Sequence, residues 1–462
     1  MSDLEKIIDE ERINSLLEVT ASDSEINKIL NKSLLMKGLS LEETAKLLNI
    51  AEDNTEQLDK LFRTAKLLKE KIYGKRIVMF APLYASNYCS NNCVYCGFRR
   101  DNKNIKRVHL SPAQVVEEAR AIMNLGHKRI VLLTGEDYVH AGLDYLEEIM
   151  DRIYHEKVFN GEIRRININI APLSVDDFKR LKSFGIGTYQ LFQETYKKDL
   201  YSKVHPAGKK ADYYWRLEAM DRAMEAGIDD VGIGPLFGMT DYRFETLATL
   251  MHANHLDKKF NCGPHTISVP RIEHAPGVDY SDNVPAPLTD GQFKKLVAVL
   301  RLAVPYTGLI LSTRELPALR RELLDLGISQ ISAASKVNPG GYTNDCGTEQ
   351  FEVGDNRSLD EIVKELVEND FIPSFCTGCY RSGRVGKDFM DLAKPGLIKR
   401  FCNTNALTTL AEYLLDYASE ETQKSGFAMI DKEIASIEDE KLRILAQEKV
   451  ALVKSGSRDV YV

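Results

Sequence analysis

Residues 77–81 read IVMFA, and residues 89–97, which follow shortly after, read CSNNCVYCG. The first run is short and apolar, as is typical of a buried strand. The second places Cys89, Cys93 and Cys96 on a polar loop that ends in glycine. Closely spaced cysteines are typical metal ligands. The stretch therefore predicts a core strand that leads directly into a metal-binding loop.

Downstream of this stretch, short aliphatic runs alternate with longer amphipathic segments. Such alternation is expected of strand-helix units around a parallel sheet. Several of the expected helices, such as residues 111–125, are followed by a glycine, which favours the same interpretation. Eight strands predict an α/β fold, a TIM-type (β/α)8 barrel, whose active site lies on the loops that follow the strands. The expected strands are residues 77–81, 129–133, 166–170, 188–192, 230–233, 266–269, 308–312 and 328–332.

The barrel is expected to span residues 76–370, with an extension on each side. Residues 1–75 have helical apolar spacing and predict a helical N-terminal extension. No strand is expected beyond about residue 370. Residues 371–462 contain further cysteines and two helical stretches, so they predict a helical C-terminal appendage that binds a cluster. The apolar seam expected to pack this appendage on the barrel consists of Ile430, Ile434 and Ile437.

Composition favours a large folded enzyme that acts on a small molecule. The chain has 462 residues, 44% of them hydrophobic, and a net charge of −7. Its acidic and basic residues are interspersed, so no basic surface that would bind nucleic acid or an anionic membrane is expected. No export signal or membrane span is recognisable, and a cytoplasmic location is expected. Eight cysteines in so long a chain are too few for a disulfide scaffold, and six of them form two close groups typical of metal sites.

The first group, Cys89, Cys93 and Cys96, supplies three thiolates without an obvious fourth nearby. A 4Fe-4S cluster usually takes four cysteines, so three ligands leave one iron open to a substrate or cofactor. The alternatives are a zinc knuckle or three unrelated cysteines. A structural zinc site needs a fourth ligand, which makes the cluster the favoured interpretation.

The second group, Cys376, Cys379 and Cys402, again supplies three thiolates, and no histidine lies between residues 372 and 462. This arrangement favours an auxiliary 4Fe-4S cluster. The alternative is a zinc site that takes its fourth ligand from the barrel, because distant ligands are invisible to sequence spacing.

A C-x3-C-x2-C loop after the first barrel strand, with an aromatic residue, Tyr95, before its last cysteine, resembles the radical S-adenosylmethionine (SAM) superfamily. The resemblance implies that the open iron binds the amino and carboxylate groups of SAM. One electron from the cluster then cleaves the sulfonium to a 5′-deoxyadenosyl radical.

Other residues are similar to cofactor-binding segments of that superfamily. Gly135 and Glu136 match the last two positions of a Gly-Gly-Glu segment that contacts the methionine amine, whereas Thr134 departs from it. Gly232 and Gly234 resemble a glycine-rich stretch near the adenine, although a tight strand end would equally explain them.

The two cysteine groups, together with residues 263–271 and 311–315, resemble the tyrosine lyases, and in particular the HydG-type lyases of FeFe-hydrogenase maturation. The resemblance implies cleavage of L-tyrosine at Cα-Cβ to p-cresol and dehydroglycine (2-iminoacetate). It further implies conversion of that fragment to carbon monoxide and cyanide on an extra, labile iron at the second cluster. The implied partners are an electron donor such as a ferredoxin or flavodoxin and a hydrogenase maturation scaffold protein.

By the same resemblance His265 is expected to bind the extra iron, since neutral imidazole is a suitable ligand. A hydrogen-bonded structural histidine is the alternative. Arg314 follows the seventh strand and is expected to bind the tyrosine carboxylate, with an ordinary salt bridge as the alternative. Cys262 and Cys346 lie outside both groups and are expected to be inert.

Two other functions stay open. One is a tyrosine lyase that stops at 2-iminoacetate, as in thiamine thiazole synthesis; that relative lacks the C-terminal cysteine group. The other is a non-catalytic iron-sulfur carrier, which would not cleave SAM.

Overall fold

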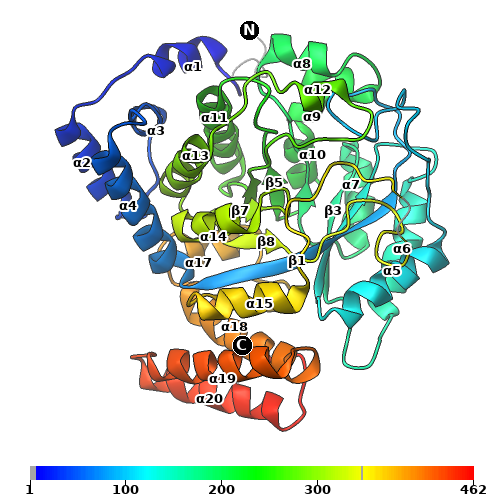
Figure 1. The fold of residues 1–462 in the computed structure, drawn as a ribbon, viewed down its shortest axis with the longest axis vertical. Helices are drawn as coiled ribbons and strands as arrows, with labels where there is room; N and C mark the ends of the chain where they lie inside the picture. The colour runs from blue at the N-terminus through cyan, green and yellow to red at the C-terminus, as the bar shows by residue number, and fades with distance from the viewer. Residues whose placement is uncertain (1–6, 345–346) are drawn as a thin grey trace.

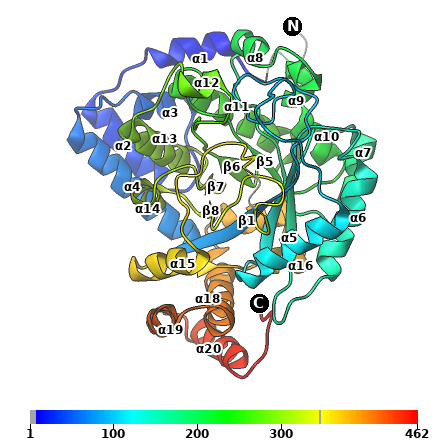
Figure 2. The same cartoon turned by 45° about the vertical axis from the view of Figure 1, so that its right-hand side comes forward.

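The computed structural model describes residues 7–344 and 347–462, so Cys346 lies outside the described residues. Its parallel strands close into a barrel, because the sheet runs in order from β2 through β8 to β1 and β1 also pairs with β2. Figure 2 shows helices surrounding these strands. The predicted TIM-type barrel of the α/β class is confirmed. The barrel strands are β1 (Arg76–Ser86), β2 (Arg129–Thr134), β3 (Arg165–Asn169), β4 (Tyr189–Gln190), β5 (Val231–Ile233), β6 (Thr266–Ser268), β7 (Gly308–Leu311) and β8 (Gln330–Ser332).

The expectation that no strand follows residue 370 is wrong. β9 (Ile372–Ser374) pairs in parallel with the start of β1, where Arg76 lies opposite Ile372. β9 has three residues and contains Pro373, and so short a run carries no periodic signal. Because β9 lies beside the start of β1, it brings Cys376 to the end of the barrel opposite the first cysteine loop.

Several helices of the barrel wall begin at a serine or threonine cap, and several are followed by a glycine. Ser111 caps α5 (Pro112–Asn124) by accepting a hydrogen bond from the Gln114 amide. Gly126, just beyond that helix, has φ +102°, a backbone conformation that favours glycine. The other wall elements are α6 (Leu143–His155), α7 (Val175–Ser183), α8 (Lys198–Val204), η2 (Lys209–Ala211), α9 (Tyr213–Leu217), α10 (Ala219–Glu225), α11 (Tyr242–Phe260), α12 (Asp279–Asp282), α13 (Asp290–Ala303), α14 (Pro317–Leu326) and α15 (Leu359–Glu368).

Four N-terminal helices lie along one side of the barrel (Figure 1). The last of them packs against α13 and α14. Its buried residues Leu61, Ala65, Leu68 and Ile72 recur at helical spacing, so they form one apolar stripe. The four helices are α1 (Glu10–Leu17), α2 (Asp23–Ser33), α3 (Leu41–Leu48) and α4 (Thr55–Tyr73).

The C-terminal residues form further helices, of which α19 and α20 lie beyond α18 (Figure 1). α19 packs against α15 and α18. Ile430 and Ile434 of the expected seam are buried, and Ile437 is half-buried against the core. None of the described helices has both the length and the apolar character needed to cross a membrane. The helices are α16 (Gly378–Arg381), α17 (Gly386–Ala393), α18 (Lys399–Asp416), α19 (Glu420–Ala435) and α20 (Glu440–Lys454).

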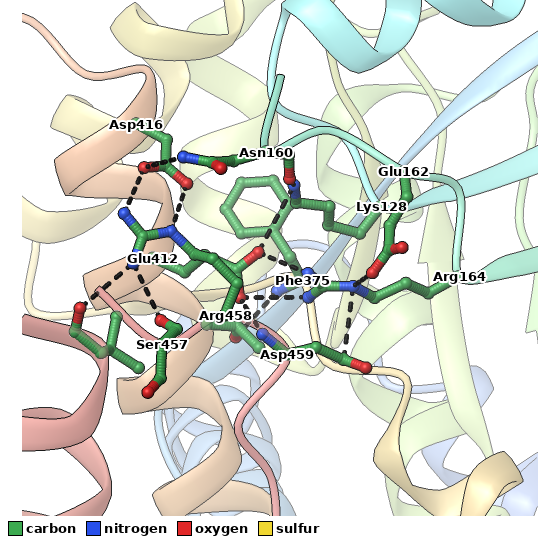
Figure 3. Close-up of polar contacts among 12 residues, drawn as sticks. Lys128, Asn160, Glu162, Arg164, Phe375, Glu412, Asp416, Ser457, Arg458 and Asp459 are labelled. Atoms are coloured by element: carbon green, nitrogen blue, oxygen red, sulfur yellow. Dashed lines mark hydrogen bonds and ion pairs between the residues drawn. The ribbon is translucent and has the colours of Figure 1, made fainter. Parts of the chain in front are cut away.

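A buried ionic network joins α18 to the barrel (Figure 3). The Glu412 carboxylate lies 2.6 Å from the Arg164 guanidinium, and both side chains are 2% exposed. Lys128 lies 3.4 Å from the same carboxylate, and the Asp459 amide donates a hydrogen bond to it. Arg458 pairs in turn with Asp416 on α18. Buried charges need such partners because desolvation is costly.

The Glu412→Gln variant is expected to lose about 3–5 kcal/mol of unfolding free energy, because it leaves two buried cations without a full counter-charge. Urea unfolding followed by circular dichroism measures this loss. Glu421→Gln is the matched control: Glu421 pairs with Lys364 at the surface, and removing such a pair costs less than about 1 kcal/mol. Equal losses in the two variants would contradict the structural role of the network.

Candidate functional site

The first cavity lies at the carboxyl ends of the barrel strands and has a volume of about 220 Å³. Cys89, Cys93 and Cys96 all line it. The loop that carries them is fixed by its backbone: the Arg99 amide donates to the Cys96 carbonyl at 3.0 Å, and the Arg107 guanidinium donates to nearby backbone carbonyls. The structure thus brings the three predicted ligands to one wall of one cavity.

These cysteines fit an iron-sulfur cluster. Burial raises the pKa of Cys89 to about 11 and that of Cys93 to about 12, so the free thiols are neutral at pH 7. A bound metal deprotonates its thiol ligands. In the described part of the chain, no fourth cysteine lines the cavity, so the donor set suits a 4Fe-4S cluster with one open iron.

Gly135 and Glu136, at the end of β2, pack directly against the cysteine loop. A Cβ atom on Gly135 would lie 2.1 Å from the Tyr88 carbonyl oxygen, so only glycine fits there. Glu136 accepts hydrogen bonds from Arg216 at 2.7 Å and Asn91 at 2.8 Å. Burial opposes its ionisation, but Arg216 and Lys210 hold the pKa of Glu136 below its ordinary value. The carboxylate is therefore ionised at the cavity wall.

A buried charge cluster completes this wall. Lys210 pairs with Glu194 at 2.7 Å, and Arg216 lies 3.8 Å from the same carboxylate. Glu194 adopts φ +70°, a conformation that side chains other than glycine rarely adopt. Sequence reasoning missed these residues because they come from separate segments and follow no motif.

Arg314 also lines the first cavity. Its guanidinium lies over the Phe351 ring at 3.3 Å and donates to the Arg271 carbonyl at 3.4 Å. Within residues 7–344 and 347–462 it has no ion pair, because the neighbouring Glu315 pairs with Arg271 instead. The alternative that Arg314 forms an ordinary salt bridge therefore does not hold for the described residues, and its charge faces the cavity.

A second cavity lies at the opposite end of the barrel, beside the starts of several strands. Cys376, Cys379, Cys402 and His265 line it. Cys376 follows β9, Cys402 lies in the first turn of α18, and His265 directly precedes β6. The structure therefore brings together all the residues that the sequence assigned to the second metal site.

The second cavity is rich in positive charge. Arg76, Arg129 and Arg384 line it, and the Nε atom of each is buried without a hydrogen-bond partner in the described structure. The Cys402 thiol lowers the pKa of Cys379 through a hydrogen bond, and nearby arginines act in the same direction. These charges suit an anionic occupant, and a cluster held by three thiolates is one.

His265 has an environment that suits a metal ligand. Burial lowers the pKa of His265, so the imidazole is neutral at pH 7, the form that binds metals. Its Nε2 atom lies 3.4 Å from the Tyr380 hydroxyl, and its Nδ1 atom lies 3.5 Å from Asp230. In the described residues no group of three or more His, Cys, Asp or Glu side chains converges on a single ion position. A four-iron cluster needs a different arrangement, because each thiolate binds a different iron.

Comparison with known proteins defines the family. The model of the radical SAM superfamily matches residues 83–252, and that of the biotin and thiamin synthesis associated domain matches residues 268–372. The 2-iminoacetate synthase of Escherichia coli is 32% identical over 77% of this chain and 90% of its own length. A crystal structure of HydG, a maturase of the FeFe-hydrogenase, superposes with a TM-score of 0.95 at 47% identity, covering 99% of this chain and 100% of that one. This chain belongs to the HydG family of radical SAM enzymes.

A second HydG structure, from Carboxydothermus hydrogenoformans, matches 97% of this chain and 98% of its own with a TM-score of 0.83 at 43% identity. Both HydG structures thus match almost the whole chain, whereas the synthase matches about three quarters of it. With these relatives, this protein is a lyase of the radical SAM superfamily.

Two of the expected cofactor glycines have a structural explanation in this HydG-family barrel. A Cβ atom on Gly232 would lie 2.5 Å from Thr266 Oγ1, and one on Gly234 would lie 2.4 Å from the Ser268 carbonyl oxygen. Neither glycine lines the first cavity. Close packing against β6 therefore requires both glycines, and their contact with adenine stays a prediction. Tyr95 does line the cavity, with its hydroxyl 2.8 Å from His205 Nε2.

Gln350 extends the first metal site of the HydG-family protein beyond its cysteines. Its side-chain amide nitrogen Nε2 donates to Cys96 Sγ at 3.6 Å, and the Tyr84 hydroxyl donates to the side-chain oxygen Gln350 Oε1 at 2.8 Å. A donor to a thiolate stabilises the more negative, reduced cluster and so raises its reduction potential.

Gln350→Leu is therefore expected to lower the potential of the first cluster by roughly 20–60 mV, the equivalent of one hydrogen bond. Tyr84→Phe should act in the same direction but more weakly, because the amide remains and only its orientation is loosened. A redox titration followed by EPR measures both shifts. A potential unchanged in Gln350→Leu would show that the contact does not reach the cluster.

Proposed function

We propose that this protein cleaves L-tyrosine at Cα-Cβ to p-cresol and 2-iminoacetate. The observation that carries the proposal is the Arg314 guanidinium, which faces the first cavity without an ion pair in the described residues. Arg314 lies on the loop after β7, and its guanidinium suits the carboxylate of an amino acid. The similarity to 2-iminoacetate synthase supports the same substrate.

In this proposal Cys89, Cys93 and Cys96 hold the first 4Fe-4S cluster, which with SAM supplies a 5′-deoxyadenosyl radical. Arg314 fixes the substrate carboxylate, so that the substrate cannot rotate away from the reacting centre. Apolar side chains of Phe80, Val131 and Ile310 form a packed group in the cavity wall. They exclude water from the substrate and from any radical formed beside them.

We further propose that the second cavity converts 2-iminoacetate to carbon monoxide and cyanide. Cys376, Cys379 and Cys402 would hold a second 4Fe-4S cluster, and His265 an additional labile iron. Support comes from the cavity that these residues share, from arginine Nε atoms in its lining that have no hydrogen-bond partner among the described residues, and from the full-length similarity to HydG. The iron product would pass to a hydrogenase maturation scaffold protein, and a ferredoxin or flavodoxin would supply electrons.

The second candidate function is a lyase that stops at 2-iminoacetate. The similarity to the Escherichia coli synthase favours it, but it assigns no chemistry to the cysteines of the second cavity. A non-catalytic iron-sulfur carrier is the third candidate, and it gives no reason for a guanidinium that lines the first cavity without an ion pair in the described residues.

One incubation tests the proposed lyase step. The anaerobically reconstituted protein is mixed with SAM, dithionite and L-tyrosine, and products are separated by liquid chromatography. We expect 5′-deoxyadenosine and p-cresol, both dependent on tyrosine and cluster. Absence of 5′-deoxyadenosine would favour a carrier, and 5′-deoxyadenosine without p-cresol would exclude tyrosine as the substrate.

A further inference from the structure

The charged residues that line the first cavity can be sorted by their partners. Three carboxylates line it, from Glu136, Glu194 and Glu273, and three cationic side chains, from Lys210, Arg216 and Arg314. Glu136 pairs with Arg216 at 2.7 Å and Glu194 with Lys210 at 2.7 Å. In the described part of the chain, Glu273 and Arg314 are the two that remain without an ion pair.

The surroundings of Glu273 explain why its carboxylate has no ion pair in the described part of the chain. The loop after β6 also carries Arg271, but that guanidinium is bound to Glu315 and Asp290. No hydrogen bond or ion pair within residues 7–344 and 347–462 engages the half-buried Glu273 carboxylate. Burial and the neighbouring Glu315 raise the pKa of Glu273 to about 7, against the opposing effect of Arg314. A half-buried carboxylate without a partner is costly, so the site is built for a positively charged group.

A single ligand can satisfy both residues. Arg314 suits a carboxylate, and Glu273 suits an ammonium group, and the two side chains do not pair with each other although both face the same cavity. An α-amino acid carries both complementary charges on one carbon. We propose that Glu273 is the acceptor for the amino group of the amino-acid substrate, with Arg314 as the partner of its carboxylate. This assignment rests on the proposed function and deepens it.

The pairing predicts selectivity for a zwitterion. Tyramine lacks the carboxylate and 3-(4-hydroxyphenyl)propionate lacks the amino group, so each analogue should leave one of the two charges unpaired. Glu273 must be ionised to bind an ammonium group. Affinity for tyrosine should therefore rise as the pH increases through about 7, and the other charged groups around this carboxylate are Arg271, Arg314, Glu315 and Glu352.

Equilibrium binding to the reconstituted holoenzyme with SAM tests the assignment. Wild-type protein is expected to bind tyrosine about 10- to 100-fold more tightly than 3-(4-hydroxyphenyl)propionate, the range for one charged hydrogen bond. In Glu273→Gln this ratio should fall to about threefold or less, with affinity for the propionate unchanged. Glu273→Asp should keep an intermediate ratio. The pH dependence of tyrosine binding near 7 should disappear in the glutamine variant.

Two control variants accompany the test. Glu352→Gln changes an exposed carboxylate of the same neighbourhood that does not line the first cavity, and it should keep the wild-type preference for tyrosine over the propionate. Arg314→Gln should instead remove the preference for tyrosine over tyramine. Binding of the propionate to the glutamate variants, and of tyramine to Arg314→Gln, shows that each cavity is folded.

The possible outcomes distinguish a failure of the Glu273 assignment from a failure of the proposed tyrosine lyase function. If wild-type protein binds SAM but not tyrosine, the proposed substrate is wrong, and the assignment of Glu273 falls with it. If tyrosine binds and the glutamine variant keeps the wild-type ratio, the assignment alone is overturned. A glutamine variant that weakens SAM and leaves the ratio intact would place Glu273 at the cofactor and would equally overturn the proposal.

Discussion

Replacing Cys93 with alanine is expected to abolish 5′-deoxyadenosine and p-cresol formation together. Cys93 is one of three cysteines on the wall of the first cavity, and its loss leaves a 4Fe-4S cluster with two protein ligands. Changes to the outer partners of metal ligands already cost 10- to 100-fold in affinity or activity, so we expect a loss of more than about 100-fold. Both products are measured in the same anaerobic incubation.

Cys262→Ala is the matched control for this prediction. Cys262 is as buried as Cys93 but lines neither cavity, and its thiol contacts the Gly263 carbonyl. The variant should lose only about 1 kcal/mol of stability and keep its clusters and both products. Equal activity in the Cys93 variant and the control would contradict the assignment of the first site.

Replacing Cys376 or Cys379 with alanine is expected to separate the two proposed reactions. These cysteines line the second cavity, at the opposite end of the barrel from the first cysteine loop. Carbon monoxide should fall by more than about 100-fold, by the same reasoning about metal ligands. p-Cresol should stay within about twofold of wild type, since changes at distant sites act independently.

Both products are measured in one sample: carbon monoxide is trapped by deoxyhaemoglobin, and p-cresol is quantified by chromatography. Cys262→Ala again serves as the control, because it should preserve both products. Unchanged carbon monoxide in the Cys376 variant would refute the role given to the second cavity. Loss of both products in that variant would show that the second site is needed for the lyase step as well.

The fold was predictable where the sequence carries local, repeated signals. Each of the eight expected strands corresponds to a barrel strand, although β1 continues to Ser86 and β4 has only two residues. β9 was missed because three residues with a central proline have no periodic pattern. The cysteines were predictable for a related reason: each group includes a C-x2-C pair, and this spacing is typical of two ligands to one metal site.

The rest of the first site depends on contacts between distant segments. Glu136 meets Arg216, and Glu194 meets Lys210, yet a single charged residue in a sequence looks like an ordinary surface residue. The sequence position of Glu273 could have marked it as a site residue, because it closely follows the sixth expected strand and catalytic residues lie on such loops. That it has no ion pair among the described residues is visible only in three dimensions.

The most direct test of the account is the fate of one labelled carbon. The reconstituted protein is incubated with SAM, dithionite and L-tyrosine carrying ¹³C in its carboxylate, and the gas is trapped by deoxyhaemoglobin and analysed by infrared spectroscopy. If the barrel has a lyase site at one end and a site that converts the fragment at the other, we expect p-cresol together with ¹³C-labelled carbon monoxide. p-Cresol formed without any carbon monoxide would contradict it.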